Sequence, residues 1–307
     1  MSELPTGRTT DGAIDLAIET TGLGKRYGKV WALRDCSIEV PAGRVSGLVG
    51  ANGAGKTTLM RLLCGLSRPT TGTAVVCGAR PGDDPRFLRE IGYLAQEVPL
   101  YRRWNTEDHL QLGAHMNEAW DDAFTRDRLR ALNIPFDRPM ESLSGGMRAQ
   151  VALALALGKR PRVLLLDEPV AALDPLARRE FLSSLAGAVA EGGVTVMLSS
   201  HLLPDLERVC DHLVLVADAQ PVVCADIEDL LASHKLLSAP ARDVTAIERD
   251  HEVILDTSTT REVSLTVKLN GPILDPAWKV EDLDLEEIVL AYLGQHAAMP
   301  RLLGSVR

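Results

Sequence analysis

Eight residues near the beginning of the chain, GANGAGKT from Gly50 to Thr57, have the types and the spacing of a phosphate-binding loop. They fit the pattern G-x-x-x-x-G-K-[ST], whose glycines let backbone N–H groups turn inward around phosphate oxygens while the following helix offers its positive end. In this pattern Lys56 reaches the β- and γ-phosphates, and the Thr57 hydroxyl holds Mg²⁺. The sequence therefore predicts a bound nucleotide with Mg²⁺, held by Gly50, Ala51, Asn52, Gly53, Ala54, Gly55, Lys56, Thr57 and Thr58.

Two adjacent carboxylates end the apolar run VLLLDEP, Val163 to Pro169. Side chains at the carboxyl edge of a parallel sheet emerge where ligands bind, so these acids are candidates for the same site. Asp167 is predicted to hold Mg²⁺ through water, and Glu168 to orient and deprotonate an attacking water. Taken alone, the segment is also explained as a buried strand followed by a solvated acidic turn.

A third motif, LSGGM from Leu143 to Met147, enters a run of apolar residues at helical spacing. Ser144, Gly145 and Gly146 have the character of a second phosphate cradle at the start of a helix. Taken alone, they are also explained as an N-cap and a tight turn.

The elements that must position these motifs alternate between buried strands and helices. The run RVSGLVG over 44–50 predicts a strand, and the leucines after the phosphate loop predict a helix. A helix is also predicted over 175–192. Further strands are predicted over 91–96, 162–169, 194–200 and 211–218. Because apolar strands that alternate with helices form parallel sheets covered on both faces, we predict an α/β protein.

Three further parts are predicted around this core. Half-exposed strands are expected over 13–19 and 36–40, and another strand over 73–78. Residues 97–140 carry charged, helix-like segments and no convincing strand, which indicates a helical insertion. After residue 234 we expect a small domain of roughly 70 residues, with a hairpin over 251–269 and a closing helix over 280–295.

The composition argues against several classes of protein. Of 307 residues, 46 % are hydrophobic and 24 % are charged, as in a globular protein, and the net charge of −9 argues against a general nucleic-acid binder. No apolar stretch approaches the ~18–20 residues that cross a bilayer, and residues 1–12 carry no apolar signal-peptide core. We therefore expect a cytosolic protein whose contact with a membrane requires a partner.

The order of the motifs (phosphate loop, helical insertion, LSGG, then VLLLDEP) resembles that of the ATP-binding subunits of ABC transporters. The resemblance implies a P-loop NTPase with a RecA-like parallel-sheet core, an antiparallel β subdomain and a helical subdomain inserted at about 97–158. The ATPase domain would cover 15–234, between a flexible tail over 1–14 and a small α+β C-terminal domain over 235–307. LSGG would contact ATP bound on a second ATPase subunit, so that two ATP molecules lie head to tail between two subunits.

The resemblance also assigns roles to residues outside the three motifs. Tyr27 is expected to stack on adenine, with Trp31 as the alternative, although Tyr27 is also explained as a half-buried edge tyrosine. Gln96 is expected to approach Mg²⁺ and the attacking water, and to begin the segment that touches the membrane partner. His201 is expected to contact the γ-phosphate and to support the catalytic glutamate, with a structural histidine as the alternative. Asp174 is expected in the loop that crosses the dimer interface, and is also a candidate N-cap.

Three positions depart from the usual pattern of the family. Met147 stands where glutamine is frequent, Val170 and Ala172 stand where a hydroxyl residue and glycine are frequent, and Ala95 stands where proline is common. None of these changes removes a group needed for hydrolysis. We therefore predict a competent ATPase with ATP and Mg²⁺ as cofactors.

Among the functions of P-loop proteins, the motifs favour the ATPase subunit of a transporter. A P-loop switch or kinase conflicts with LSGG, and a soluble ABC ATPase usually has a long coiled coil or two ATPase domains in one chain. LSGGM, the single-domain organisation and the segment DLEEIVLAYL, 284–293, resemble exporters of drugs, antibiotics or lipids, with an importer as the alternative. The expected partners are a membrane-spanning permease and a second ATPase subunit, at the cytoplasmic face of the membrane, with no nucleic acid.

Overall fold

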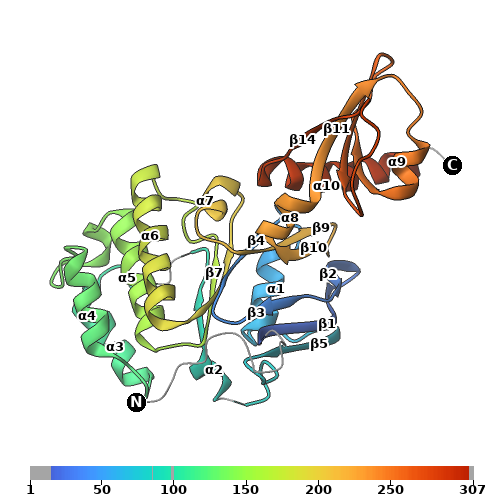
Figure 1. The fold of residues 1–307 in the computed structure, drawn as a ribbon. Coiled ribbons are helices and arrows are strands. Elements are labelled where there is room, and N and C mark those ends of the chain that lie inside the picture. The colour runs from blue at the N-terminus through green and yellow to red at the C-terminus, as the bar shows by residue number, and fades with distance from the viewer. Residues whose placement is uncertain (1–14, 85, 98–99, 304–307) are drawn as a thin grey trace. The chain divides into compact units, whose positions relative to one another are not determined.

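The computed structural model describes residues 15–84, 86–97 and 100–303 (Figure 1). The chain divides into two compact units, an N-terminal one over 1–221 and a C-terminal one over 222–307. The domain limits expected from the sequence, including the helical subdomain at about 97–158, stay predictions. The predicted tail over 1–14 lies outside the described residues.

A six-stranded sheet, in the order β10-β9-β4-β8-β7-β6, carries the core of the fold, and its edge strand β10 is Gln220–Asp226. Its parallel strands are β4 (Val45–Val49), β6 (Ile91–Leu94), β7 (Val163–Asp167), β8 (Thr195–Ser199) and β9 (His212–Ala217). Every residue of β4, β7, β8 and β9 is buried, as apolar strands covered on both faces require. The predicted α/β fold with a parallel-sheet core is confirmed.

A second sheet is antiparallel and is built around the long strand β1. Its strands are β1 (Leu16–Tyr27), β2 (Val30–Cys36), β3 (Glu39–Pro41) and β5 (Thr71–Val76). The single strand predicted over 36–40 was wrong, because β2 ends and β3 begins inside it. Thr20 fixes this break, since its hydroxyl donates to the Cys36 carbonyl at 2.8 Å and accepts from the Ile38 N–H at 3.0 Å.

The chain between β6 and β7 is helical, as predicted. It forms α3 (Thr106–Met116), α4 (Asp122–Ala131), the short 3-10 helix η1 (Met140–Ser142) and α5 (Gly145–Gly158). Leu110, Leu129 and Val151, one from each long helix, are fully buried in a common core. The first turn of α3 is closed by a reciprocal capping box between Asn105 and Asp108.

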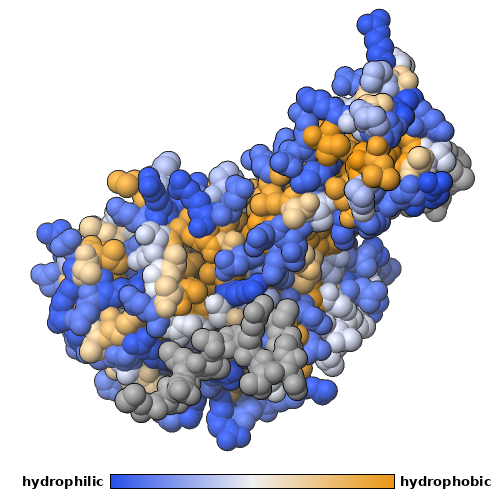
Figure 2. Space-filling model, viewed as in Figure 1, coloured by the Kyte–Doolittle hydropathy of each residue, from blue (hydrophilic) through white to orange (hydrophobic). Residues whose placement is uncertain are grey.

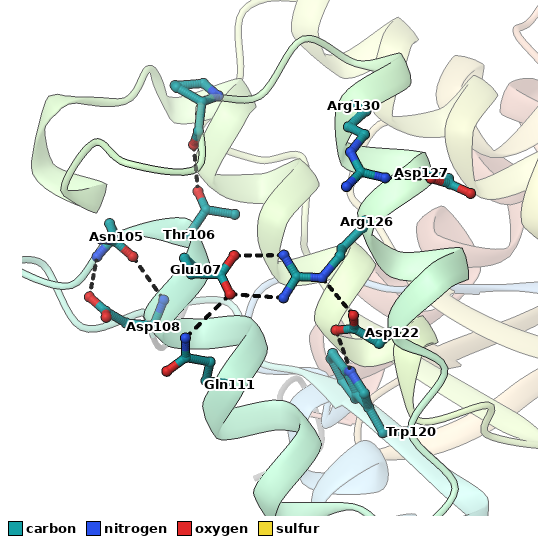
Figure 3. A network of polar contacts seen from close by, with 11 residues as sticks. Asn105, Thr106, Glu107, Asp108, Gln111, Trp120, Asp122, Arg126, Asp127 and Arg130 are labelled. Carbon is teal, nitrogen blue, oxygen red and sulfur yellow. Dashed lines mark hydrogen bonds and ion pairs between the residues drawn. The ribbon is translucent and has the colours of Figure 1, made fainter.

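Arg126 of α4 ties α3 to α4 through a forked ion pair (Figure 3). Its Nη1 and Nη2 atoms donate to the two carboxylate oxygens of Glu107 at 2.6 and 2.8 Å. Its Nε donates to Asp122 at 2.6 Å, one turn earlier on its own helix. The guanidinium lowers the pKa of the Glu107 carboxyl to about 2, because it stabilises the charged form.

The N-terminal unit also contains α1 (Lys56–Leu63), which packs on β7, and the short helix α2 (Phe87–Glu90). Further along the chain are α6 (Pro175–Gly192), which packs on α5, and α7 (Leu203–Glu207). The helix predicted over 175–192 is therefore confirmed, and Gly193 ends it in the left-handed conformation, with φ 62°.

The C-terminal unit contains an antiparallel sheet in the order β12-β13-β11-β14. Its elements are β11 (His234–Pro240), β12 (Glu252–Asp256), β13 (Glu262–Lys268) and β14 (Lys279–Asp282), with helices α8 (Ile227–Ser233), α9 (Thr245–Asp250) and α10 (Leu285–Leu303). The predicted α+β character and the β12–β13 hairpin are confirmed.

The closing helix predicted over 280–295 was wrong in its first residues. Residues up to Asp282 form β14, which pairs with β11. The helix begins at Leu285 because Asp284 and Glu287 cap it reciprocally, with N–H to carboxylate distances of 2.9 and 2.8 Å.

The face shown in Figure 2 is largely hydrophilic, and hydrophobic residues gather on it in each of the two units. Large apolar side chains exposed on the C-terminal unit include those of Leu274, Val280 and Leu290. Within the described part of the chain, no helix has both the length and the apolar character needed to cross a membrane.

Candidate nucleotide-binding site

The phosphate loop connects the end of β4 to the start of α1. A Cβ atom on Gly50 would lie 2.3 Å from the Val216 carbonyl oxygen, and one on Gly55 would lie 2.5 Å from that of Ala32. Gly55 also has a φ of 111°, which residues with a side chain rarely adopt. Glycine is therefore required at both ends of the loop, where the backbone passes close to neighbouring strands.

A cavity of about 720 Å³ lies over this loop. It is lined by Gly50, Ala51, Asn52, Gly53, Gly55, Lys56, Thr57 and Thr58, and by Ala32, Gln96, Glu168 and His201 from other segments. Of the predicted loop residues, only Ala54 does not line it. Ala54 is buried, and its N–H donates to the Ala51 carbonyl at 3.0 Å, which shapes the turn. The fold thus gathers the loop and the three predicted catalytic residues around one cavity.

Lys56, at the start of α1, is the principal cation at this cavity. Its side chain is only 6 % exposed, and its Nζ atom donates to the carbonyl oxygens of Gly50 at 2.8 Å and Ala51 at 3.3 Å. The same atom lies 3.6 Å from Glu168 Oε1. An ammonium group held in this way, beside the N-terminus of α1, provides positive charge for the phosphates of a nucleotide.

Asp167, the last residue of β7, carries a buried carboxylate with one unpaired oxygen. The residue is 1 % exposed, and its Oδ1 accepts a hydrogen bond from the Ser199 hydroxyl at 2.9 Å. Its Oδ2 has no hydrogen-bond partner among the described residues. Because a buried, unpaired carboxylate oxygen is unfavourable, Oδ2 fits a Mg²⁺ ion or one of its waters. Asp167 itself is not among the residues that line the cavity, whereas Thr57 and Gln96, the other predicted Mg²⁺ ligands, are.

Glu168 follows Asp167 and lies between a lysine and a histidine. Its Oε1 faces Lys56, and its Oε2 lies 3.2 Å from His201 Nδ1. The backbone of Glu168 has a φ of 48°, and its N–H donates to Ser199 Oγ at 2.8 Å. A carboxylate fixed in this way at the cavity has the geometry to orient a water molecule and to accept a proton from it.

Comparison with known proteins identifies the family. Residues 33–171 match the family model described as ABC transporter. The Nod factor export ATP-binding protein I of Ralstonia nicotianae is 33 % identical over 238 residues, which cover 75 % of this chain and 72 % of that protein. The molybdenum import ATP-binding protein ModC of Rhodopseudomonas palustris is 33 % identical over 267 residues, which cover 84 % of this chain and 70 % of that protein. This chain belongs to the ABC transporter ATP-binding proteins.

A solved structure supports the same assignment for the fold. The structure described as an ATP-binding subunit of an ABC transporter superposes with a TM-score of 0.62 at 28 % identity, over 70 % of this chain and 92 % of that one. The expected P-loop ATPase fold is therefore confirmed. As a member of the ABC family, the chain is an ATPase.

The ABC signature residues lie outside the residues that line this cavity. Ser144 is the N-cap of α5, where its hydroxyl accepts from the Met147 N–H at 3.2 Å. Gly145 and Gly146 form the first turn of the helix, and a Cβ on Gly146 would lie 2.7 Å from the Cβ of Ala177. The cap and the tight turn are thus present, whereas a contact with nucleotide on a second subunit stays a prediction.

Asp174 and Tyr27 also lie outside the residues that line this cavity. Asp174 is the N-cap of α6, and its carboxylate accepts from the N–H groups of Leu176 at 3.1 Å and Ala177 at 3.0 Å. Tyr27 ends β1 and is 52 % exposed, with Lys25 Nζ 5.2 Å from its ring centroid. The predicted roles of both residues, at the dimer interface and on adenine, stay predictions.

Two residues of the site were not predicted from the sequence. Ala32 of β2 lines the cavity, but an alanine in a strand gives no sign of a ligand. Ser199 contacts both acids of the motif LLLDEP, and the signal for it was available. It ends an apolar strand two residues before the predicted catalytic histidine, where a buried hydroxyl needs a partner.

Proposed function

We propose that this ABC ATPase powers the export of a drug-like, antibiotic-like or lipid substrate through a separate membrane subunit. The observation that carries the ATPase mechanism is the single cavity at which Lys56, Gln96, Glu168 and His201 meet the phosphate loop. ATP-binding subunits of this family act with membrane permease components and as dimers. For this chain, the direction of transport, the substrate class and the position at the cytoplasmic face are part of the proposal.

In the proposed mechanism, the loop N–H groups and Lys56 bind the phosphates of ATP. Mg²⁺ held by Thr57, Asp167 and Gln96 would neutralise charge on the β- and γ-phosphate oxygens. Glu168 orients the attacking water and accepts its proton, a role that typically contributes ~10²–10⁴-fold in rate. His201, 3.2 Å from the Glu168 carboxylate, supports that orientation and contacts the γ-phosphate.

The proposal assigns the second half of each ATP site to another ATPase subunit. Ser144, Gly145 and Gly146 begin α5, a 14-residue helix whose positive end is available for the phosphates of ATP on that subunit. Asp174 begins α6 nearby, so both segments present capped helix starts. ATP binding then favours the closed dimer, and hydrolysis reopens it, because the ligand contacts are made only in the closed state. Gln96 and the helical segment after it carry the movement to the membrane subunit.

The first experiment compares Glu168→Gln with the wild type. We expect the variant to lose Mg²⁺-ATP turnover by at least ~100-fold and to form a dimer that depends on ATP, measured by light scattering after size exclusion. Glu180→Gln, an exposed glutamate on α6, is the matched control and should keep wild-type turnover. Full turnover by Glu168→Gln, or monomers of every protein in the presence of ATP, would refute the proposed mechanism.

Export is tested with inverted membrane vesicles from cells that overproduce the chain with its permease. The relatives include both an export and an import protein, so sequence similarity alone does not give the direction. We expect ATP-driven accumulation of a fluorescent lipid or a cationic dye inside inverted vesicles, and none with Glu168→Gln. ATP-driven uptake found only in right-side-out vesicles would favour the importer instead.

A further inference from the structure

Ser199 is a buried hydroxyl at the point where the two acids of the ATPase site meet. It is the last residue of β8, is 0 % exposed, and lies directly opposite Asp167 in the parallel register of β7 and β8. Its Oγ lies 2.9 Å from Asp167 Oδ1 and 2.8 Å from the Glu168 backbone nitrogen. One side-chain atom therefore contacts two consecutive residues for which we propose different roles.

The directions of these two hydrogen bonds are fixed by chemistry. A hydroxyl has one proton to donate, an ionised carboxylate only accepts, and a backbone N–H only donates. Ser199 must therefore donate to Asp167 Oδ1 and accept from the Glu168 N–H. The first bond occupies Oδ1 and leaves the buried Oδ2, which has no hydrogen-bond partner among the described residues, as the oxygen that would hold a metal or its water.

The second bond holds Glu168 in an unfavourable backbone conformation. Its φ of 48° lies in the left-handed region, which residues with a side chain seldom adopt without support from their surroundings. In this conformation the Glu168 carboxylate lies between Lys56 Nζ at 3.6 Å and His201 Nδ1 at 3.2 Å. The Ser199 hydroxyl supplies a hydrogen bond that supports this turn of the chain.

We propose that Ser199 is a positioning residue for ATP hydrolysis, whose hydroxyl sets the orientation of the metal-holding carboxylate and the backbone of the catalytic glutamate together. This inference rests on the proposed function of Asp167 and Glu168. Both hydrogen bonds share the Ser199 oxygen atom. A rotation of the Asp167 carboxylate therefore also changes the hydrogen bond that holds the Glu168 backbone. Binding of the metal and placement of the base are coupled through this serine.

The test separates positioning from structural support by measuring metal binding without turnover. In the Glu168→Gln background, which is expected not to hydrolyse ATP, binding of Mn²⁺ with ATP is followed by electron paramagnetic resonance. Adding Ser199→Ala should weaken Mn²⁺ binding about 10-fold, because groups that hydrogen-bond a metal-holding carboxylate typically contribute 10–100-fold. The affinity for ATP in EDTA should stay within about twofold, since the phosphate loop is unchanged.

In the otherwise wild-type protein, Ser199→Ala should lower kcat about 10-fold and leave the KM for ATP within about twofold. The matched control is Ser46→Ala in the neighbouring strand β4. Ser46 is also 0 % exposed and its hydroxyl also has a partner, His212 Nδ1 at 3.2 Å. This control should lose stability comparably and keep wild-type kcat and Mn²⁺ affinity.

Two outcomes overturn the inference. One is that Ser199→Ala keeps kcat and Mn²⁺ affinity within about twofold of the wild type, which would give Ser199 a structural role only. The other is that Ser46→Ala loses as much of both as Ser199→Ala. If Ser199→Ala does not fold, Ser199→Cys has a side chain of similar volume and a weak donor, and must show the same loss of Mn²⁺ affinity. Failure of the proposed function is seen separately, as normal turnover by Glu168→Gln.

Discussion

Substitution of Gly55 by alanine tests whether the close approach of the phosphate loop to β2 is what requires glycine. The new Cβ atom would lie 2.5 Å from the Ala32 carbonyl oxygen, closer than van der Waals contact permits, and both atoms belong to the backbone or are bonded to it. The residue would also keep a φ of 111°. Either the loop or β2 must move.

The loss of stability expected for Gly55→Ala has two causes, the left-handed backbone conformation and the close contact with Ala32. A side chain in a left-handed conformation costs roughly 1–2 kcal/mol, and overpacking of a tight contact typically costs about 1–3 kcal/mol more. Gly193→Ala introduces the backbone strain without the close contact, since Gly193 has a φ of 62° and no atom lies within 4 Å of the added Cβ. We therefore expect losses of about 3 kcal/mol for Gly55→Ala and about 1 kcal/mol for Gly193→Ala.

The assay combines urea unfolding, followed by circular dichroism, with titration of a fluorescent ATP analogue. Gly55→Ala should also weaken nucleotide binding by at least about 10-fold, because displaced N–H groups lose charge-assisted hydrogen bonds to phosphate. Gly193→Ala, at the far end of α6, should bind as the wild type does. Equal losses of stability in the two variants, with unchanged nucleotide affinity in both, would refute the argument from close approach.

Two further predictions concern pH. The pKa of Glu107 is lowered to about 2 by Arg126, so its contribution to stability is present above about pH 4.5 and is lost as the pH falls towards 2. Arg126→Met should therefore lower Tm by a few degrees at pH 7 and by less at pH 3; an equal loss at both would contradict this prediction. Burial lowers the pKa of His234, whose Nδ1–H donates to the Leu230 carbonyl oxygen at 2.8 Å and whose Nε2 accepts from the Tyr292 hydroxyl at 3.0 Å. The contribution of neutral His234 to stability is present above its ordinary pKa near 6.5 and is lost as the pH falls below that value. The Tm of His234→Gln should therefore fall less than that of the wild type between pH 7.5 and 5.5.

The sequence predicted best those parts in which local pattern and three-dimensional environment agree. The run over 163–166 is apolar because β7 is buried on both faces, and the two acids stand at the end of this strand, where the parallel sheet presents side chains to a ligand. The phosphate loop was equally clear, since the close contacts at Gly50 and Gly55 leave glycine as the residue that fits.

Elsewhere, contacts between residues distant in the sequence determine the secondary structure, and the local pattern does not reveal them. Residues 36–40 alternate as one strand does, but the side chain of Thr20, far away in the sequence, bonds the backbone at both sides of a break. The acids around Asp282 are typical of a first helical turn, yet pairing with β11 makes that segment a strand. Ser199 was missed for the same reason, because its importance arises from the register of β8 against β7.

The packing of α5 against α6 has a mechanical consequence. Gly146 has no side chain, so the first turn of α5 approaches Ala177, in the first turn of α6, more closely than two alanines could. The hydroxyl of Ser144 and the carboxylate of Asp174 close these same two turns. The two helix starts therefore pack directly against each other, so a displacement of the first turn of α5 towards α6 would displace the first turn of α6 as well.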